Sequence, residues 1–270
     1  EVVADELGAL TEKAKEFGLS KMTMYLSSLD LFQSPQNLGE VLEVFARTSA
    51  DSGVEYELRG LARIDSFLRA LDRVPELYDL ISQSGVKVVG FGIDGTTEKV
   101  WKSQHKRQKS LSKIDEGFDK CREVGITPEI LMVMGFPEDS LGSLAKNYAY
   151  TVSRAISHGA VARPYVAKQF TPGNAGWNNP KYQREVEMLL DDPRLFVDLD
   201  YAIMGSPLTH PNPVTRVLSN MAYVALVATL EPFGRNATYP LVPRLHENGI
   251  LSRVRNKVAD YVNRVMPFDK

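Results

Sequence analysis

Predicted helices and strands alternate through the first two thirds of the chain, and this order is the strongest constraint on its fold. Apolar residues recur at helical spacing between Val3 and Phe17, and a short buried strand follows from Met22 to Leu26. The same order then repeats at intervals of about 30 to 40 residues, the length of a βαβ unit. The predicted strands lie at 22–26, 54–63, 86–94, within 127–139 and at 163–173, and the predicted helices at 3–17, 38–50, 75–85, 112–124 and 140–159.

Such a repeat predicts a parallel sheet, in either a (β/α) barrel or an open doubly wound sheet. The strand sequence ILMVM at 130–134 is apolar at every position, which indicates cover on both faces or burial inside a barrel. The repeat begins with a helix, so we expect a first strand and its loop upstream of Glu1. We interpret residues 1–177 as an incomplete parallel (β/α) barrel and residues 178–270 as a helical C-terminal region, because the alternation stops after TPGNAGWNNP.

The C-terminal region contains two further helical patterns. The apolar run MAYVALVATL at 221–230 predicts a core helix, since it is too short for the roughly 20 residues that span a bilayer. A final helix is predicted with a solvated cationic side that could also serve as a partner surface. Its apolar side carries Ile250, Val254, Val258, Tyr261, Val262 and Val265, and its other side Arg253, Arg255, Lys257 and Arg264.

Charge and cysteine content narrow the possible partners. The chain has 32 Lys and Arg against 34 Asp and Glu, a net charge of -2, so we expect a small-molecule ligand rather than nucleic acid or a membrane. Its one cysteine, Cys121, excludes an internal disulfide and any metal site built from several cysteines. The N-terminus lacks the features of a signal peptide, and the cysteine usage fits a reducing compartment, so a cytoplasmic location is expected.

Polar and small residues follow the ends of the predicted strands. In a parallel α/β fold these ends form the edge of the sheet where ligands bind. Arg63 and Asp94 each end a strand, so they are candidate ligand contacts on these grounds. The other candidates at strand ends are Ser27, Ser28, Asp30, Gly135 and Thr171.

The segment at 85–144 carries an ordered series of short motifs. A strand ends in Gly92, Ile93 and Asp94, and Lys106 follows about a dozen residues later. A helix then ends in Val124, Gly125 and Ile126, and the next strand ends in Met134, Gly135, Pro137 and Glu138. In this order and spacing, the segment resembles the second half of a radical S-adenosylmethionine (radical SAM) domain, including the subgroup joined to cobalamin-binding modules. The resemblance extends over residues 1–177.

This resemblance implies roles for individual residues. Asp94 would accept hydrogen bonds from the ribose hydroxyls of S-adenosylmethionine (SAM), and Lys106 would pair with its methionine carboxylate. Ser27 and Ser28 stand where the family holds the methionine amino group with a G-G-E-P-like motif, so the sequence departs from the family there. The remaining contacts that the family implies are Asp30 and Arg63 at strand ends, and Val133, Gly135 and Thr171 near the adenine.

The chain departs most from the family in its cysteines. Radical SAM chemistry needs three thiolates in C-x-x-x-C-x-x-C, which hold a 4Fe-4S cluster that cleaves SAM to a 5'-deoxyadenosyl radical. Cys121 lies within a predicted helix, on a packing face. The motif therefore either lies upstream of Glu1 or was lost, and we expect no catalysis by this chain alone. The alternatives are a cluster-less radical SAM-like binding or scaffold protein, and an unrelated (β/α)-barrel lyase.

Overall fold

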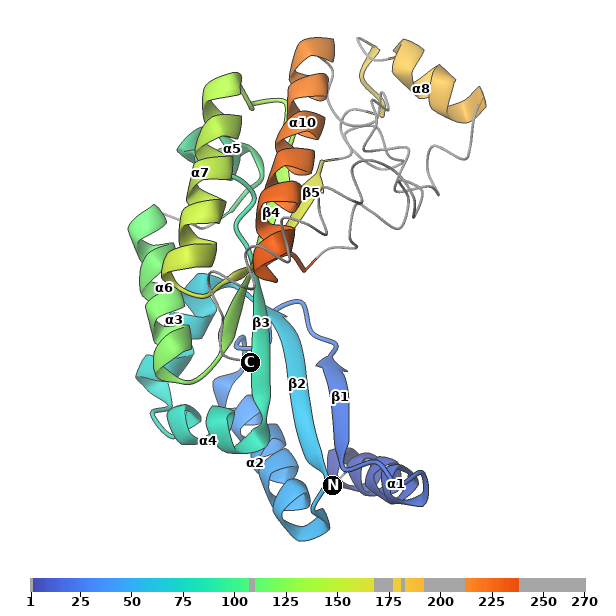
Figure 1. Cartoon of the computed structure of the whole chain (residues 1–270), viewed down its shortest axis with the longest axis vertical. Coiled ribbons are helices and arrows are strands. Elements are labelled where there is room, and N and C mark those ends of the chain that lie inside the picture. Colours follow the sequence, from blue (N-terminus) through green and yellow to red (C-terminus); the bar gives the residue numbers. More distant parts are fainter. Residues whose placement is uncertain (1, 107–109, 168–176, 181–182, 192–211, 238–270) are drawn as a thin grey trace. The chain divides into compact units, whose positions relative to one another are not determined.

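The computed structural model describes residues 2–106, 110–167, 177–180, 183–191 and 212–237 (Figure 1). Five strands form one sheet, and each strand is hydrogen-bonded to the next in chain order, β1-β2-β3-β4-β5. Their bounds are β1 Lys21–Leu26, β2 Glu55–Ala62, β3 Val86–Gly92, β4 Thr127–Met134 and β5 Val161–Val166.

The strand order decides between the two predicted architectures. β1 and β2 are parallel from the pair Lys21 and Glu55 to the pair Leu26 and Gly60, and β2 and β3 are parallel with one irregularity at Leu58 and Arg59. A doubly wound sheet reverses its strand order at a switch point, whereas the described strands keep one sequential order. The predicted incomplete parallel (β/α) barrel with a C-terminal helix is therefore confirmed.

Helices connect the strands, and the structure has two that the sequence pattern missed. α3 begins directly after the predicted strand at 54–63, in a segment for which the pattern predicts no element, and α5 lies in a segment that the pattern predicts as a loop. The helices are α1 Val2–Glu16, α2 Pro35–Ser52, α3 Ile64–Arg73, α4 Leu77–Ser84, α5 Glu98–Ser103, α6 Leu111–Glu123, α7 Leu141–Ser157, α8 Gln183–Asp191 and α10 Pro213–Leu230, followed by the 3-10 turn η2 Glu231–Phe233.

The chain forms two compact units, residues 1–92 with 107–129 and residues 93–106 with 130–270. A row of buried aromatic rings runs through the core of the first unit. The ring centroids of Phe32 and Phe67 are 4.9 Å apart, those of Phe67 and Phe91 5.6 Å, and those of Phe91 and Phe118 6.1 Å. These contacts join the β1–α2 loop, α3, β3 and α6 in one apolar core.

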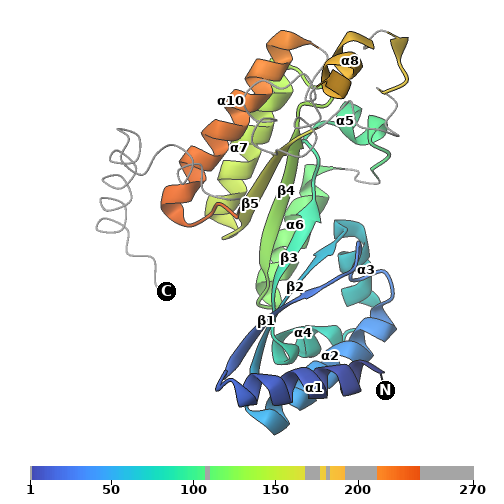
Figure 2. The same ribbon diagram turned by 90° about the vertical axis from the view of Figure 1, so that its right-hand side faces the viewer.

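In the second unit, α7 and α10 lie side by side (Figures 1 and 2). The hydroxyls of Tyr148 and Thr229 are 2.8 Å apart and join the two helices. After η2, Asn236 forms a parallel bridge with Ala162 at the start of β5, and Arg235 donates from Nη1 to the carbonyl of Gly159 at 2.7 Å. α10 thus connects β5 to a further extended segment that runs parallel to it.

Among the described helices, none has the length and apolar content required to cross a bilayer.

Candidate functional site

The loop that follows β3 is held in an uncommon conformation. Asp94 has a φ of 50°, in the left-handed region where few residues other than glycine occur, and Gly95 follows with a φ of 91°. The backbone N–H of Ile93 still donates to Leu131 of β4 at 3.0 Å, so the left-handed turn begins directly at the sheet edge. Non-glycine residues in this region are concentrated at functional sites, because tertiary contacts must hold them there.

Asp94 and Lys106 form an ion pair. Lys106 Nζ contacts Asp94 Oδ2, and the side chain of Asp94 is only 11% exposed whereas that of Lys106 is 38% exposed. A carboxylate that is largely removed from water is stable in its charged form only with a cation or hydrogen-bond donors beside it. The two residues to which the radical SAM resemblance gives the ribose and the carboxylate of SAM thus lie against each other.

Trp101 explains how these residues come together. Its Nε1 donates to the carbonyls of Ile93 and Gly95 at 3.0 Å each, and its own carbonyl accepts from the N–H of Lys106 at 2.8 Å. Trp101 is a residue of α5, and its side chain is buried. Trp101 thus joins the two ends of the 93–106 loop by hydrogen bonds, and the Asp94 carboxylate and the Lys106 ammonium lie next to each other.

The turn after β4 is organised by Asp139, which sequence reasoning missed. Asp139 Oδ2 accepts from the N–H groups of Gly135 at 2.8 Å and Phe136 at 3.1 Å, and Ser143 Oγ donates to Oδ1 at 2.7 Å. Ser140 and Ser143 form a reciprocal cap at the start of α7. Asp139 directly precedes the N-cap residue Ser140, but the N–H groups that it accepts from belong to the turn before it and not to α7.

Apolar side chains lie next to this turn. Val133 of β4 is partly buried against a cluster of Val100, Phe136 and Ala167. A side chain at Gly135, whose φ is 86°, would contact Ser219 of α10 at 3.2 Å. Val133 and Gly135, both predicted near the adenine, both belong to the second unit, Val133 beside the apolar cluster and Gly135 beside Ser219 and Val166. Thr171 lies outside the described residues.

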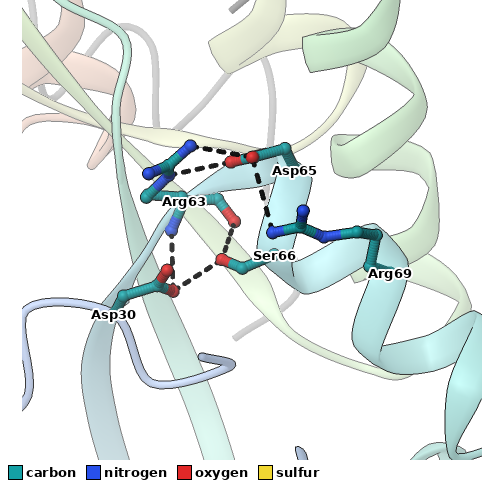
Figure 3. A network of polar contacts seen from close by, with 5 residues as sticks. All are labelled: Asp30, Arg63, Asp65, Ser66 and Arg69. Carbon is teal, nitrogen blue, oxygen red and sulfur yellow. Dashed lines mark hydrogen bonds and ion pairs between the residues drawn. The ribbon is translucent and has the colours of Figure 1, made fainter. Parts of the chain in front are cut away.

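A second polar group lies at the ends of β1 and β2 (Figure 3). Asp30 Oδ1 accepts from the backbone N–H of Arg63 at 3.3 Å and from Ser66 Oγ at 2.6 Å. Arg63 donates from Nε and Nη2 to the two carboxylate oxygens of Asp65 at 2.9 and 2.8 Å, and Arg69 pairs with the same carboxylate at 3.6 Å. The predicted contacts Asp30 and Arg63 are therefore brought together, with the guanidinium of Arg63 directed at Asp65.

Asp30, which follows β1, caps the N-terminus of α3. Arg63 is the N-cap residue of α3 and makes no side-chain cap of its own. The carboxylate of Asp30 instead receives the N–H of Arg63, and its backbone N–H donates to Ser28 Oγ at 3.3 Å. Ser28 thus supports Asp30, while Ser27 is exposed beside them.

Replacing Asp30 by alanine is expected to lower the free energy of unfolding by about 1 to 2 kcal/mol, the range for lost helix caps. The loss leaves the Arg63 N–H at the start of α3 without its acceptor. Asp72→Ala is the matched control, because Asp72 is an exposed acid at the other end of the same helix. We expect the control to change stability by less than about 0.5 kcal/mol in urea unfolding; equal losses would contradict the capping role.

An ion pair also joins β1 and β2. Lys21 Nζ lies 2.7 Å from Glu57 Oε1, and this hydrogen bond lowers the pKa of Glu57 and raises the pKa of Lys21. The Glu57 contribution to stability is therefore present above the ordinary carboxyl pKa and is lost as the pH falls through the lowered value. Since Lys21 is exposed and Glu57 is partly exposed, solvent screens the pair and we expect the effect to be small.

The residues of this chain do not fit a 4Fe-4S cluster. Such a cluster is held by several cysteine thiolates, and the sequence contains only Cys121. Cys121 is fully buried on α6, and burial raises the pKa of its thiol, so the predicted packing role is confirmed. No group of three His, Cys, Asp or Glu side chains suited to a metal ion occurs within the described residues.

No protein-family model and no curated protein sequence matches the chain. Among solved structures, it is similar to the radical SAM methyltransferase TsrM from Kitasatospora setae with cobalamin and a 4Fe-4S cluster bound. That match has a TM-score of 0.45 and 16% identity, over 59% of this chain and 27% of that one. A second structure of TsrM, with its tryptophan substrate and a SAM analog, gives a TM-score of 0.47 and 15% identity over 62% and 30% of the two chains.

The chain is also similar to Elp3 of the archaeon Methanocaldococcus infernus with an N-terminal deletion. The TM-score is 0.44 and the identity 12%, over 68% of this chain and 44% of that one. The chain thus spans less than half the length of each of these proteins.

Proposed function

We propose that this chain is a SAM-binding partial barrel of the radical SAM type. The observation that carries the proposal is the buried carboxylate of Asp94, held in left-handed backbone at the end of β3 and paired with Lys106. A buried carboxylate in left-handed backbone at a strand end, paired with a partly exposed cation, is typical of a binding site in parallel α/β folds. SAM is proposed as the ligand because the motifs around Asp94, Lys106 and Gly135 resemble those of a radical SAM domain in their order and spacing.

The chemistry of the pair suits a ligand with both hydroxyl and carboxylate groups. The carboxylate of Asp94 would accept hydrogen bonds from the two ribose hydroxyls, and the ammonium of Lys106 would bind the methionine carboxylate. Without ligand, the two side chains neutralise each other. With ligand, the carboxylate of Asp94 would keep two hydroxyl donors and the ammonium of Lys106 would keep a carboxylate, so binding would replace the ion pair by charge-assisted hydrogen bonds at both groups.

Other residues would bind the remaining parts of SAM. Val133 and the apolar side chains of Phe136 and Ala167 would cover the flat face of the adenine. The predicted contacts Ser27, Ser28, Asp30 and Arg63 belong to the first compact unit, and Thr171 lies outside the described residues. They stay predictions that the Asp94 and Lys106 assignment does not require.

Radical formation belongs to the whole protein in this proposal and not to these 270 residues. A cluster would supply the electron that cleaves SAM, and this chain contains one buried thiol in place of the required set. The same observation favours the second candidate, a cluster-less radical SAM-like binding protein. The first candidate requires SAM binding, whereas a cluster-less scaffold protein and an unrelated barrel lyase do not.

Isothermal titration of the whole chain with SAM tests the proposal. We expect saturable binding with a dissociation constant between about 10 µM and 1 mM, since a few charged contacts supply roughly 4 to 7 kcal/mol. Adenosine, which lacks the carboxylate, and methionine, which lacks the ribose, should each bind at least about tenfold more weakly. An absence of heat at millimolar SAM, or equal binding of adenosine and SAM, would contradict the proposal.

Anaerobic incubation of the 270-residue chain with iron and sulfide is expected to give no cluster absorbance in the visible range. The physical reason is that Cys121 is buried and burial raises the pKa of its thiol, so little thiolate is available as a ligand. Thiol titration of the native and the unfolded chain is the control, because unfolding should expose one reactive thiol. A stable cluster on the native chain would overturn this assignment.

A further inference from the structure

The exposed side of α10 is apolar along its whole length. Val214 is 65% exposed, Val217 54%, Met221 60% and Val224 37%. These four residues, with the exposed Ala225 and Ala228, follow helical spacing and form a stripe, which we call the α10 stripe. The sequence pattern predicts a core helix here, and that prediction is correct for only one side of the helix.

The other side of α10 is packed in the usual way. Leu226, Val227 and Leu230 are buried, and the hydroxyl of Thr229 is hydrogen-bonded to that of Tyr148 on α7. Its 18 residues contain a single charged side chain, Arg216. A helix that is apolar on both sides is normally buried on both sides, and a contiguous exposed apolar surface marks a binding surface.

The path of the chain after α10 limits what can cover the stripe. The chain turns at Gly234 and pairs with β5 at Ala162, so residue 237 stays beside the helix and strand from which it came. An extended segment of residues 238–249 reaches up to about 40 Å, whereas α10 is about 27 Å long. Residues from 250 onward can therefore reach any position along the α10 stripe.

The segment that begins there has a complementary sequence. Residues 250–265 place Ile250, Val254, Val258 and Tyr261 at helical spacing, and Val262 and Val265 extend the same side. If helical, the segment is about 22 Å long, close to the roughly 21 Å between Val214 and Ala228. The cations Arg253, Arg255, Lys257 and Arg264 would then face water and supply the polar outer surface that α10 lacks.

We propose that residues 250–265 bind the α10 stripe as an amphipathic helix of the same chain. The tether favours this occupant over a second molecule, because a short linker holds the segment at an effective concentration in the millimolar range. The driving force is burial of the four large apolar side chains of the stripe, which are at present accessible to water. This proposal is independent of SAM binding.

Thiol labelling of the whole chain tests the proposal. The variant Met221→Cys places a thiol in the centre of the stripe, and Ile156→Cys places one on α7 at a site that is 72% exposed. The buried Cys121 of the unchanged chain provides the background rate. We expect Cys at position 221 to react with a disulfide reagent at least about tenfold more slowly than Cys at position 156, because the bound segment must open first.

A second variant separates the occupants. Adding Val254→Asp and Val258→Asp to Met221→Cys should raise its labelling rate to that of Ile156→Cys, since charges on the apolar side disrupt docking. Equal rates for the two thiols in the otherwise unchanged chain would overturn the proposal. Slow labelling of Cys at position 221 that persists in the aspartate variant would also overturn the proposal. Labelling that becomes slower as the protein concentration rises would overturn it too, because a second copy of the chain would then cover the stripe.

Discussion

Replacing Asp94 by asparagine is expected to weaken SAM binding by about 10- to 100-fold. A hydrogen bond to a charged group contributes about 1.5 to 3 kcal/mol, and the substitution removes the charge that would hold the ribose hydroxyls. Asparagine retains the shape of the side chain and tolerates the left-handed φ of 50° at this position, so the β3 loop should keep its conformation. Alanine would confound binding with backbone strain.

The matched control for Asp94→Asn is Glu98→Gln. Glu98 is an exposed acid on α5 of the same unit, and it pairs with Lys102 at 2.9 Å, so this variant removes one negative charge nearby without touching the proposed site. Titration calorimetry should show SAM affinity within about twofold of the unchanged chain for the control. Unchanged affinity in Asp94→Asn, or equal losses in both variants, would remove Asp94 from the binding site.

Replacing Gly85 by alanine is expected to destabilise the protein by about 3 to 5 kcal/mol, or to prevent folding. Gly85 ends α4 with a φ of 85°, and a Cβ there would lie 2.0 Å from the backbone oxygen of Tyr56 on β2. Its carbonyl also accepts from the N–H of Leu58 at 2.8 Å, so the chain cannot move away without breaking the start of the β2–β3 pairing. The clash therefore adds to the cost of the left-handed backbone.

Gly53→Ala isolates the contribution of the clash. Gly53 ends α2 in the same unit with a φ of 74°, yet a Cβ there would have no heavy atom within 4 Å. We expect a loss of about 1 to 2 kcal/mol from backbone strain alone, measured by urea unfolding. If the two variants lost the same stability, the close approach between Gly85 and Tyr56 would not be what limits this position.

Much of the fold follows from the sequence, because the alternation of periodic segments reflects local interactions. The strands at Met22–Leu26 and Val86–Gly92 and the helices ending at Gly85 and Gly125 were predicted close to their observed bounds. The sequence pattern misses α3 because only Arg63 separates it from the end of β2, and no glycine or proline marks the boundary between the strand and the helix. Its buried residues Ile64, Phe67 and Leu71 have helical spacing, which was the available signal.

Sequence patterns name the candidate site residues one by one but do not predict how their side chains are arranged. Position after a strand identified Asp94, and a motif identified Lys106, yet neither pattern indicated that they form an ion pair. The indole of Trp101 closes the loop between them, and an indole N–H that binds two distant carbonyls has no signature in a linear pattern. Asp139 was likewise missed because its partners are backbone N–H groups, which every residue type shares.

The class of fold and the residue types that end each strand follow from local sequence patterns, since helical and strand periodicities and turn residues act over a few neighbouring positions. The cap that Asp30 provides to α3, the ion pair of Lys106 with Asp94 and the exposed apolar side of α10 are visible only in the folded chain. These features depend on contacts between residues far apart in the chain. Such contacts are selected by packing and by pairing of buried polar groups, which no local pattern records.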